Sequence, residues 1–513
     1  MSSTVTVKRQ NSIDRIDEQL YGHFAEHLGR CIYGGLWVGE DDRVPTEDGI
    51  RMDTVELLEE LDIPVLRWPG GCFADDYHWK DGIGPREERP TQRNLWWAQG
   101  REEAFIEPND FGTDEFLRLC ELLETEPYLA VNVGSSTPEE ALDWIEYCNF
   151  DEETDLTRRR AENGHSEPYG VKYWGIGNEN WGCGGRFAPA EYGDEYRRFA
   201  NYLRGFRNHL APEETDAEFI ACGHLTDDWN RTFLEQLNAG MEFGPGTFLG
   251  MGAPAELMDH FSVHRYYQAG GDTEFSDEQY YRIFARARQL AGDIDRAAST
   301  LAEYVPTGEV GIIVDEWGVW HPEATPDNGL EQANTVRDAL TAAGAFDIMH
   351  DRADVVSMAN IAQTVNVLQC LVETDEEAAW KTPTYHVFDL YNDHAGNTAV
   401  ETDIETETKV FHDEDNDVPL VSASASVTDN DELYVTASNR HLDETRTLEI
   451  EAGGEAASAS GTVLFADSDP RAYSTKDNAE TFEPESIAVE ATDDGTFVVE
   501  IPPASVVGVT IPQ

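Results

Sequence analysis

The chain has 513 residues, enough for one large domain and a smaller one. It carries 101 acidic and 36 basic residues, a formal net charge of -65. A nucleic-acid backbone would be repelled by this charge, so nucleic-acid binding is excluded. Disorder is also excluded for most of the chain, because disorder requires low hydrophobicity and 40% of these residues are apolar.

The basic side of the composition is unusual, because only six of the 36 basic residues are lysines and the rest are arginines. Excess carboxylate with scarce lysine resembles the composition of proteins from salt-accumulating archaea. A folded protein with this charge repels itself in dilute salt. We therefore expect a halophilic source, with ordinary acidity as the alternative.

The seven cysteines are odd in number, form no C-x-x-C pair and mostly lie in apolar runs. This pattern predicts buried free thiols in a reducing cytosol. The first ten residues, MSSTVTVKRQ, show neither an apolar signal core nor a twin-arginine motif. No uninterrupted apolar run is long enough to span a membrane. We expect a cytoplasmic protein that binds neither membranes nor nucleic acid.

Short apolar runs alternate with amphipathic stretches over the first three quarters of the chain. Strand–helix alternation predicts a parallel sheet covered by helices, and eight units favour a (β/α)₈ TIM barrel, of the α/β class, over an open sheet. No glycine-rich dinucleotide fingerprint follows the first strand. We place the catalytic barrel at residues 18–384. The eight predicted strands are 22–29, 63–71, 126–134, 171–179, 218–224, 258–267, 310–318 and 354–363.

The helical patterns between these strands include a long one at 277–305. After about residue 385 the pattern changes to short β-rich runs separated by acidic turns. This predicts an appended all-β sandwich, jelly-roll-like, over residues 385–513. The strand-like N-terminus, residues 1–17, is expected to complete that sandwich. The acidic segment 401–418 is interpreted as a surface loop or a solvated edge.

Polar residues gather at the predicted carboxyl ends of the barrel strands, where active sites of such barrels lie. Glu179 and Glu316 end two apolar strands, and a carboxyl pair is what glycoside hydrolysis requires. Arg67 is the expected partner that keeps one carboxylate ionised while the other stays protonated.

Each of these residues has a simpler interpretation when taken alone. Glu179 could be a loop residue, Glu316 could form a structural ion pair with Arg67, and His264 could be a core histidine. About half of the tryptophans are expected to be core residues. The hypothesis of a catalytic site rests on the gathering of these residues at one end of the barrel.

Seven segments together resemble glycoside hydrolase family 51, in order over roughly residues 20–391. They are YGHFAEHLGRCIYGGLW (21–37), VLRWPGGCFADDYHWKDGIGP (65–85), YWGIGNENWG (173–182), FSVHRYY (261–267), VDEWGVWH (314–321), MANIAQTVNVLQ (358–369) and TPTYHVFDLY (382–391). The resemblance implies a retaining α-L-arabinofuranosidase that releases terminal arabinofuranosyl residues from oligo- or polysaccharides, without a cofactor. It also implies a homo-oligomer, often a hexamer.

The resemblance assigns roles to particular residues. Glu179 matches the acid/base and Glu316 the nucleophile. Residues that match sugar-binding or neighbouring polar positions are Glu26, Arg67, Cys72, Trp97, Asn178, His264, Tyr266 and Gln363. Cys72 stands where Asn or another small polar residue is expected, and a thiol forms only weak hydrogen bonds. The segment 98–112 is longer than usual, so a lid there is expected to differ.

Three alternatives remain open at this stage. A retaining β-xylosidase or endo-glucanase of the same fold would carry the same catalytic pair. A non-catalytic sugar-binding protein would not need both glutamates together with Arg67. A metal enzyme is disfavoured, because no HExxH or paired-cysteine spacing is present.

The charge generates the first testable prediction. Molar KCl or NaCl should preserve fold and activity, because the Debye length falls from about 10 Å at 0.1 M to about 3 Å at 1 M and screens surface repulsion. Below a few tenths molar the protein should unfold or dissociate. Circular dichroism and activity across a salt series measure this, and full activity after dialysis into millimolar buffer would contradict the halophilic interpretation.

Overall fold

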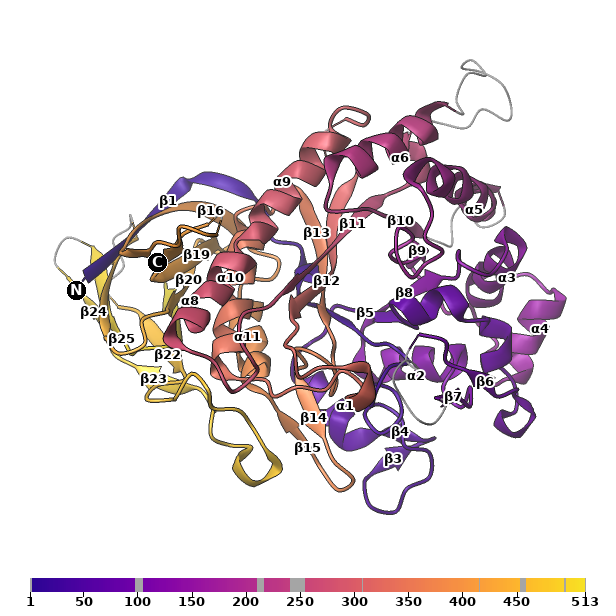
Figure 1. The fold of residues 1–513 in the computed structure, drawn as a ribbon, viewed down its shortest axis with the longest axis horizontal. Helices are drawn as coiled ribbons and strands as arrows, with labels where there is room; N and C mark the ends of the chain where they lie inside the picture. The colour runs from indigo at the N-terminus through magenta and orange to yellow at the C-terminus, as the bar shows by residue number, and fades with distance from the viewer. Residues whose placement is uncertain are drawn as a thin grey trace.

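The computed structural model describes residues 2–96, 105–209, 216–239, 254–306, 308–414, 416–452, 458–492 and 495–512. Two bodies are visible in Figure 1, a barrel wrapped by helices and a β-rich domain that contains both chain termini. The predicted Trp97 and residues 98–104 of the predicted lid lie outside the described residues.

Eight parallel strands close into a barrel in the order β10-β11-β12-β13-β2-β5-β8-β9. The predicted (β/α)₈ barrel is therefore confirmed, and each predicted strand overlaps one of these. Their bounds are β2 (Gly22–Phe24), β5 (Val65–Trp68), β8 (Glu126–Val131), β9 (Tyr173–Ile176), β10 (Glu218–Cys222), β11 (His260–Tyr267), β12 (Gly311–Val319) and β13 (Val356–Ala362).

Helices surround the barrel (Figure 1). Amphipathic ones such as α2 and α8 bury an apolar face, whereas α10 is buried on every side. They are α1 (Met52–Glu59), α2 (Thr113–Leu123), α3 (Pro138–Asn149), α4 (Asp155–Glu162), α5 (Pro189–His209), α6 (Asp227–Ala239), α7 (Pro254–Leu257), α8 (Asp277–Ala287), α9 (Gln289–Leu301), α10 (Val336–His350) and α11 (Pro383–Asn392). None of the helices in the described residues is long and apolar enough to cross a membrane.

The predicted long helix at 277–305 is wrong in one respect, because it consists of two helices. A turn at Arg288 separates α8 from α9. The Arg288 N–H still bonds to the Phe284 carbonyl, but the Ala291 N–H bonds to the Arg288 carbonyl in the tighter 3₁₀ pattern. No proline or glycine stands at this turn, so the break could not be predicted from the residues around Arg288.

Apolar side chains fill the middle of the barrel interior. A buried cluster inside the barrel contains Val65, Tyr128, Tyr173, Ile220, Ile313 and Met358, one from each of six strands. The hydroxyl of Tyr128 is the polar group of this layer that points toward the site, and it donates to Asp315 Oδ2 at 2.8 Å. The apolar layer thus forms the floor beneath the charged residues at the carboxyl ends of the strands.

The all-β domain is a ten-stranded sheet in the described residues, in the order β23-β22-β26-β20-β19-β16-β1-β21-β25-β24. The N-terminal strand β1 lies between β16 and β21 (Figure 1). The strand bounds are β1 (Ser2–Arg15), β16 (Thr398–Glu405), β19 (Val421–Val427), β20 (Leu433–Asn439), β21 (Arg446–Glu451), β22 (Ser460–Leu464), β23 (Glu485–Ile487), β24 (Val489–Ala491), β25 (Thr496–Ile501) and β26 (Ser505–Ile511).

The first five residues of the segment 401–418 are strand and not loop, because they belong to β16. They pair with β1, whereas β19 pairs only with Thr398 and Ala399 at the start of β16, so the alternative of a solvated edge agrees with the structure there. The strand alternates exposed acids such as Glu401 with more buried residues such as Val400. The strand was not recognised in the sequence because its exposed positions are acidic, and Asp and Glu are depleted in strands.

Two buried, hydrogen-bonded histidines lie side by side where α10 meets the β-domain. His350, the last residue of α10, bonds to Tyr21 and to Ser424 of β19 at 2.8 and 2.9 Å. His394 bonds to Ser426 and Thr436 at 2.8 and 2.9 Å. Burial lowers the pKa of His350 to about 3, and it lowers the pKa of His394 well below its ordinary value. Both rings are therefore neutral when the protein is folded.

This interface predicts a specific pH dependence of stability. Below pH 6.5 the unfolded chain protonates His394 but the folded chain does not, so the stability present above that pH is lost as pH falls. His394→Gln removes one group that the unfolded chain protonates. Between pH 6 and 4 the free energy of unfolding of wild type should therefore fall by about 1.4 kcal/mol per pH unit more than that of the variant. Denaturant unfolding at several pH values measures this. Exposed His412→Gln is the control, and equal slopes for wild type and His394→Gln would contradict the assignment.

Candidate active site

The described candidate residues lie together at the carboxyl end of the barrel. Arg67 lies in β5, His264 and Tyr266 lie in β11, and Glu316 lies in β12. The others follow the ends of their strands: Glu26 after β2, Asn178 and Glu179 after β9, and Gln363 after β13. Because these strands come from all around the barrel, closure of the sheet brings distant parts of the sequence to one place.

Arg67 lies at the centre of the site and is almost completely buried. Its Nη1 donates to Glu316 Oε1 at 2.9 Å, and its Nη2 donates to Asn178 Oδ1 at 2.6 Å. Its Nε lies 3.6 Å from Asp315 Oδ1. One guanidinium therefore fixes side chains from two different strands, and two buried carboxylates balance its charge.

The environment of Glu316 favours its ionised form. Burial acts to raise the pKa of this carboxyl, but the charges of His264 and Arg67 and hydrogen bonds from Tyr266 and Arg67 outweigh burial. The Tyr266 hydroxyl donates to Glu316 Oε2 at 2.8 Å. The pKa of Glu316 is therefore held below its ordinary value, and the group is a carboxylate at neutral pH.

Glu179 faces Glu316 across His264. The His264 Nδ1 lies 3.0 Å from Glu179 Oε1 and 3.6 Å from Glu316 Oε2. Burial acts to lower the pKa of His264, but the charge of Glu316 and the contacts with Glu179 raise it above its ordinary value. Glu179 is more open to solvent than Glu316, with side-chain exposures of 21% and 8%. Carboxylate oxygens of the two residues lie within 4.8 Å of each other.

Glu26 lies in a niche formed by glycines. A Cβ atom on Gly71 would lie 2.8 Å from the Glu26 carboxylate oxygens, so only glycine lets the backbone approach this closely. The carboxylate accepts from the Phe73 N–H at 2.9 Å and from Gln363 Nε2 at 3.1 Å. These contacts orient an acidic acceptor toward the same end of the barrel as the glutamate pair.

Sequence reasoning missed Asp75, which supports the site from beneath. This buried carboxylate accepts from the Val133 and Gly134 N–H groups at 2.8 Å each and from the Asn178 N–H at 3.0 Å. Burial raises the pKa of Asp75 to about 7 despite these hydrogen bonds. Its only signal was the dipeptide Asp75–Asp76 after the double glycine, which does not show which acid points inward.

The expectation that all cysteines are free thiols is wrong for two of them. Cys72 and Cys183 form a disulfide, whereas the other five are free and buried. The two residues are 111 positions apart, and no C-x-x-C spacing marked them. The sulfur of Cys72 is therefore not a thiol that could bind a sugar hydroxyl.

Two groups of side chains among the described residues have metal-ligand spacing, namely Cys72–Glu179–Cys183 and Glu179–His264–Glu316. In the first group the two sulfurs are bonded to each other. In the second group Glu316 already accepts from Arg67 and Tyr266. The first group therefore lacks three separate ligands, and in the second group the Arg67 guanidinium beside Glu316 opposes a cation.

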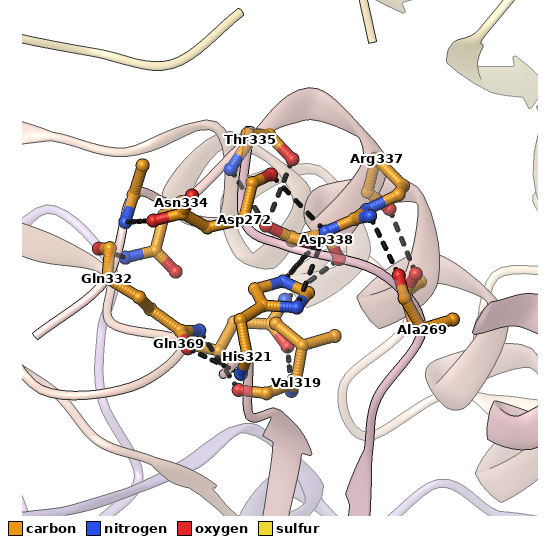
Figure 2. A network of polar contacts seen from close by, with 12 residues as sticks. Ala269, Asp272, Val319, His321, Gln332, Asn334, Thr335, Arg337, Asp338 and Gln369 are labelled. Carbon is orange, nitrogen blue, oxygen red and sulfur yellow. Dashed lines mark hydrogen bonds and ion pairs between the residues drawn. The ribbon is translucent and has the colours of Figure 1, made fainter. Parts of the chain in front are cut away.

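A buried polar network holds the loops that follow β11 and β12 (Figure 2). Arg337 donates to the carbonyl of Ala269, beyond β11, at 3.1 Å, and its neighbour Asp338 lies 3.0 Å from the His321 ring. Gln369 accepts from the Val319 N–H, at the end of β12, at 2.9 Å. The strands that carry Tyr266 and Glu316 are thereby fixed relative to each other beyond the site.

This geometry can perform two-carboxylate chemistry. One carboxylate is buried, ionised and held by donors, as a nucleophile or base must be. The other is close to it, more exposed and in contact with a protonatable imidazole, as a proton donor to a bound group must be. Oxygens of the two carboxyl groups lie within 4.8 Å of each other, so both groups can act on one bond of a bound molecule.

Comparisons with known proteins agree with this geometry. Residues 57–282 match the family model "Alpha-L-arabinofuranosidase 1 domain", and residues 315–505 match "Alpha-L-arabinofuranosidase C-terminal domain". The chain is 37% identical to an intracellular exo-alpha-L-arabinofuranosidase of Bacteroides ovatus, over 99% of this chain and 95% of the relative.

Solved structures are similar over the whole length. The structure of a GH51 arabinofuranosidase from Xanthomonas axonopodis pv. citri superposes with a TM-score of 0.89 at 32% identity and 99% coverage of both chains. An arabinose complex of the alpha-L-arabinofuranosidase from Thermotoga maritima gives a TM-score of 0.82 at 29% identity and full coverage of both chains.

The hydrogen bond from Tyr266 generates a prediction about Glu316. Tyr266→Phe removes a donor to the carboxylate, so the pKa of Glu316 should rise, by up to about one unit. Carbon-13 NMR of labelled glutamate carboxyls measures it. Tyr267→Phe is a matched control, because the neighbouring Tyr267 hydroxyl has no hydrogen-bond partner among the described residues. An unchanged pKa in Tyr266→Phe would show that the bond does not stabilise the ionised form.

Proposed function

The chain belongs to glycoside hydrolase family 51, the α-L-arabinofuranosidases, and we propose that it hydrolyses terminal, non-reducing α-L-arabinofuranosides with retention through Glu316 and Glu179. The observation that carries this proposal is the pair of carboxylates within 4.8 Å, of which one is held ionised by Arg67 and Tyr266. Retaining glycosidases place their two carboxyl groups about 5–5.5 Å apart, and inverting ones about 6.5–9.5 Å apart.

In the first step, Glu316 attacks the anomeric carbon of the arabinofuranosyl ring while Glu179 protonates the leaving oxygen. The bond to the leaving group breaks as the glycosyl ester forms. Arg67 keeps Glu316 ionised before attack. Tyr266 donates to Glu316 Oε2, so Oε1 and Oε2 are distinguished and the carboxylate cannot rotate freely.

In the second step, Glu179 is a carboxylate and removes a proton from water, which attacks the anomeric carbon and releases Glu316. Its greater exposure supports this role, because both the leaving group and water must reach it. His264, which contacts both glutamates, supports the change in the protonation of Glu179 between the steps.

Sugar-binding roles are proposed for Glu26, Asn178 and Gln363. Each is buried, polar and oriented by a named partner: the Phe73 N–H, Arg67 and Glu26, respectively. Buried polar groups held in this way can recognise ring hydroxyls, and they reject a sugar that leaves them unpaired. Trp97 is proposed as part of the sugar-binding wall on the resemblance alone.

Location, salt adaptation and assembly are also proposals. The intracellular relative and the five free buried thiols support a cytoplasmic enzyme that acts on short arabinose-containing oligosaccharides from arabinan or arabinoxylan. The net charge of -65 supports a halophilic source. The family resemblance supports a homo-oligomer, and we propose a hexamer. We propose a barrel at 18–384 and a β-domain at 385–513 that residues 1–17 complete.

Kinetics should separate the two glutamates. Glu316→Ala should lose about 10³-fold or more of the rate on every substrate, because no covalent intermediate can form. Glu179→Ala should lose most on arabinosides with poor leaving groups, because a good leaving group needs little protonation. Azide should partly rescue Glu179→Ala on an activated aryl arabinoside. The same response of both variants to leaving group and azide would refute these roles, and faster hydrolysis of aryl β-D-xylosides would refute the sugar assignment.

A further inference from the structure

The disulfide between Cys72 and Cys183 links two loops of the active-site end that are not adjacent in the barrel. Cys72 begins the short 3₁₀ helix η2 (Cys72–Asp76), which follows β5. Cys183 lies in the turn that follows β9. In the barrel, β8 separates these two strands. The Cα atoms of the cysteines are 5.5 Å apart, so the bond joins loops that follow two strands with no direct pairing between them.

The second loop is the turn that carries Glu179. Glu179 has a φ of +42°, in the left-handed region that side-chain-bearing residues rarely adopt. The N–H groups of Gly182 and Gly184 both donate to the Glu179 carbonyl, at 2.6 and 3.2 Å. Such a backbone conformation costs about 1 kcal/mol or more and persists only where the surroundings enforce it.

Helix η2 enforces this conformation from both sides of Glu179. Before it in sequence, the Asp75 carboxylate accepts from the Asn178 N–H at 3.0 Å. After it, the disulfide holds Cys183. A Cβ atom on Gly184 would lie 2.4 Å from Asp75 Oδ2 and 2.0 Å from the Asn178 carbonyl oxygen. The backbone of the turn therefore packs closely against the Asp75 side chain of η2.

The bonded sulfur also touches the proposed acid/base directly. Cys183 Sγ lies 3.8 Å from Glu179 Oε2 and 3.8 Å from Asn178 Nδ2. Both cysteines are only half-buried, so a small reductant can reach the bond, in contrast to the five buried thiols. A disulfide in a protein of a reducing compartment is more often functional than structural.

We propose that the Cys72–Cys183 disulfide is the positioning element of Glu179, so that its reduction selectively disables proton donation to the leaving group. The inference rests on the proposed acid/base role of Glu179. Reduction frees Cys183. Among the described residues, η2 then contacts the turn by one hydrogen bond, which the Asn178 N–H donates to Asp75. The turn keeps its hydrogen bonds to Arg67 and His264, but it loses the covalent link that fixes the Cys183 sulfur beside the Glu179 carboxyl.

The redox step balances with a dithiol as reductant. A thiolate of the reductant attacks one sulfur and displaces the other as a thiolate; the second thiol of the reductant then releases the first cysteine. Two cysteine thiols and one oxidised dithiol result. Two electrons pass to the protein, and an oxidant that accepts two electrons, such as a disulfide of small molecules, reverses the step.

The bond itself is tested by counting thiols in the denatured chain. Alkylation without reductant, followed by mass spectrometry, should label five of the seven cysteines, and prior reduction should label all seven. Peptide mapping should assign the difference to Cys72 and Cys183. Seven labelled cysteines without reductant, in protein purified under air, would overturn the proposal.

The positioning role is tested by kcat/KM on substrates with different leaving groups. Dithiothreitol treatment of wild type should lower kcat/KM about tenfold or more on an unactivated arabinoside and less than about twofold on a 2,4-dinitrophenyl arabinoside. Cys72→Ala/Cys183→Ala should show the same pattern without reductant and no further response to it. Cys120→Ala, which removes a buried free thiol on α2, is the control and should behave like wild type.

The outcomes separate this inference from the proposed function. A uniform loss on both substrates, or a lower melting temperature with unchanged kcat/KM, would show a merely structural bond and overturn the positioning role. If Glu179→Ala itself lacks the leaving-group dependence, the acid/base assignment fails instead. If the loss of kcat/KM depends on the leaving group in Glu179→Ala but not in the reduced enzyme, only the disulfide inference is overturned.

Discussion

The buried guanidinium of Arg67 is the constraint on which the site depends. It donates to Glu316 on β12 and to Asn178 beyond β9, and Asp315 helps to balance its charge. An isolated buried charge would be costly, so the cation and its carboxylates must fold together. The same contacts that satisfy this requirement fix the nucleophile and hold it ionised, so stability and chemistry share one set of interactions.

The rest of the architecture keeps this arrangement in place. The buried apolar layer that includes Val65 and Met358 fills the barrel interior below the charged residues, so their side chains stay at the carboxyl end. The Arg337 network beyond β11 and β12 fixes the strands that carry Tyr266 and Glu316. Helix η2 performs the corresponding task for the turn of Glu179. The two glutamates thus have separate supports, and their relative position follows from barrel closure.

Much of this organisation could be predicted from sequence, for identifiable physical reasons. Apolar runs that end in polar residues, such as the one before Glu316, mark buried parallel strands and their functional ends. The features that could not be predicted depend on contacts between distant segments. Nothing near Cys72 indicates that Cys183 is its partner, and nothing in Asp75–Asp76 shows which acid is buried. The strand β16 was missed because its exposed face is acidic, and the turn at Arg288 has no local breaker.

Double displacement by the two carboxylates is tested most directly by the anomeric configuration of the first-formed product. Proton NMR of an aryl α-L-arabinofuranoside during early hydrolysis, before the released sugar mutarotates, distinguishes the two anomers. Attack by Glu316 followed by water predicts α-L-arabinofuranose as the first product. Initial release of the β-anomer would mean that water attacks directly, and it would contradict the roles assigned to both glutamates.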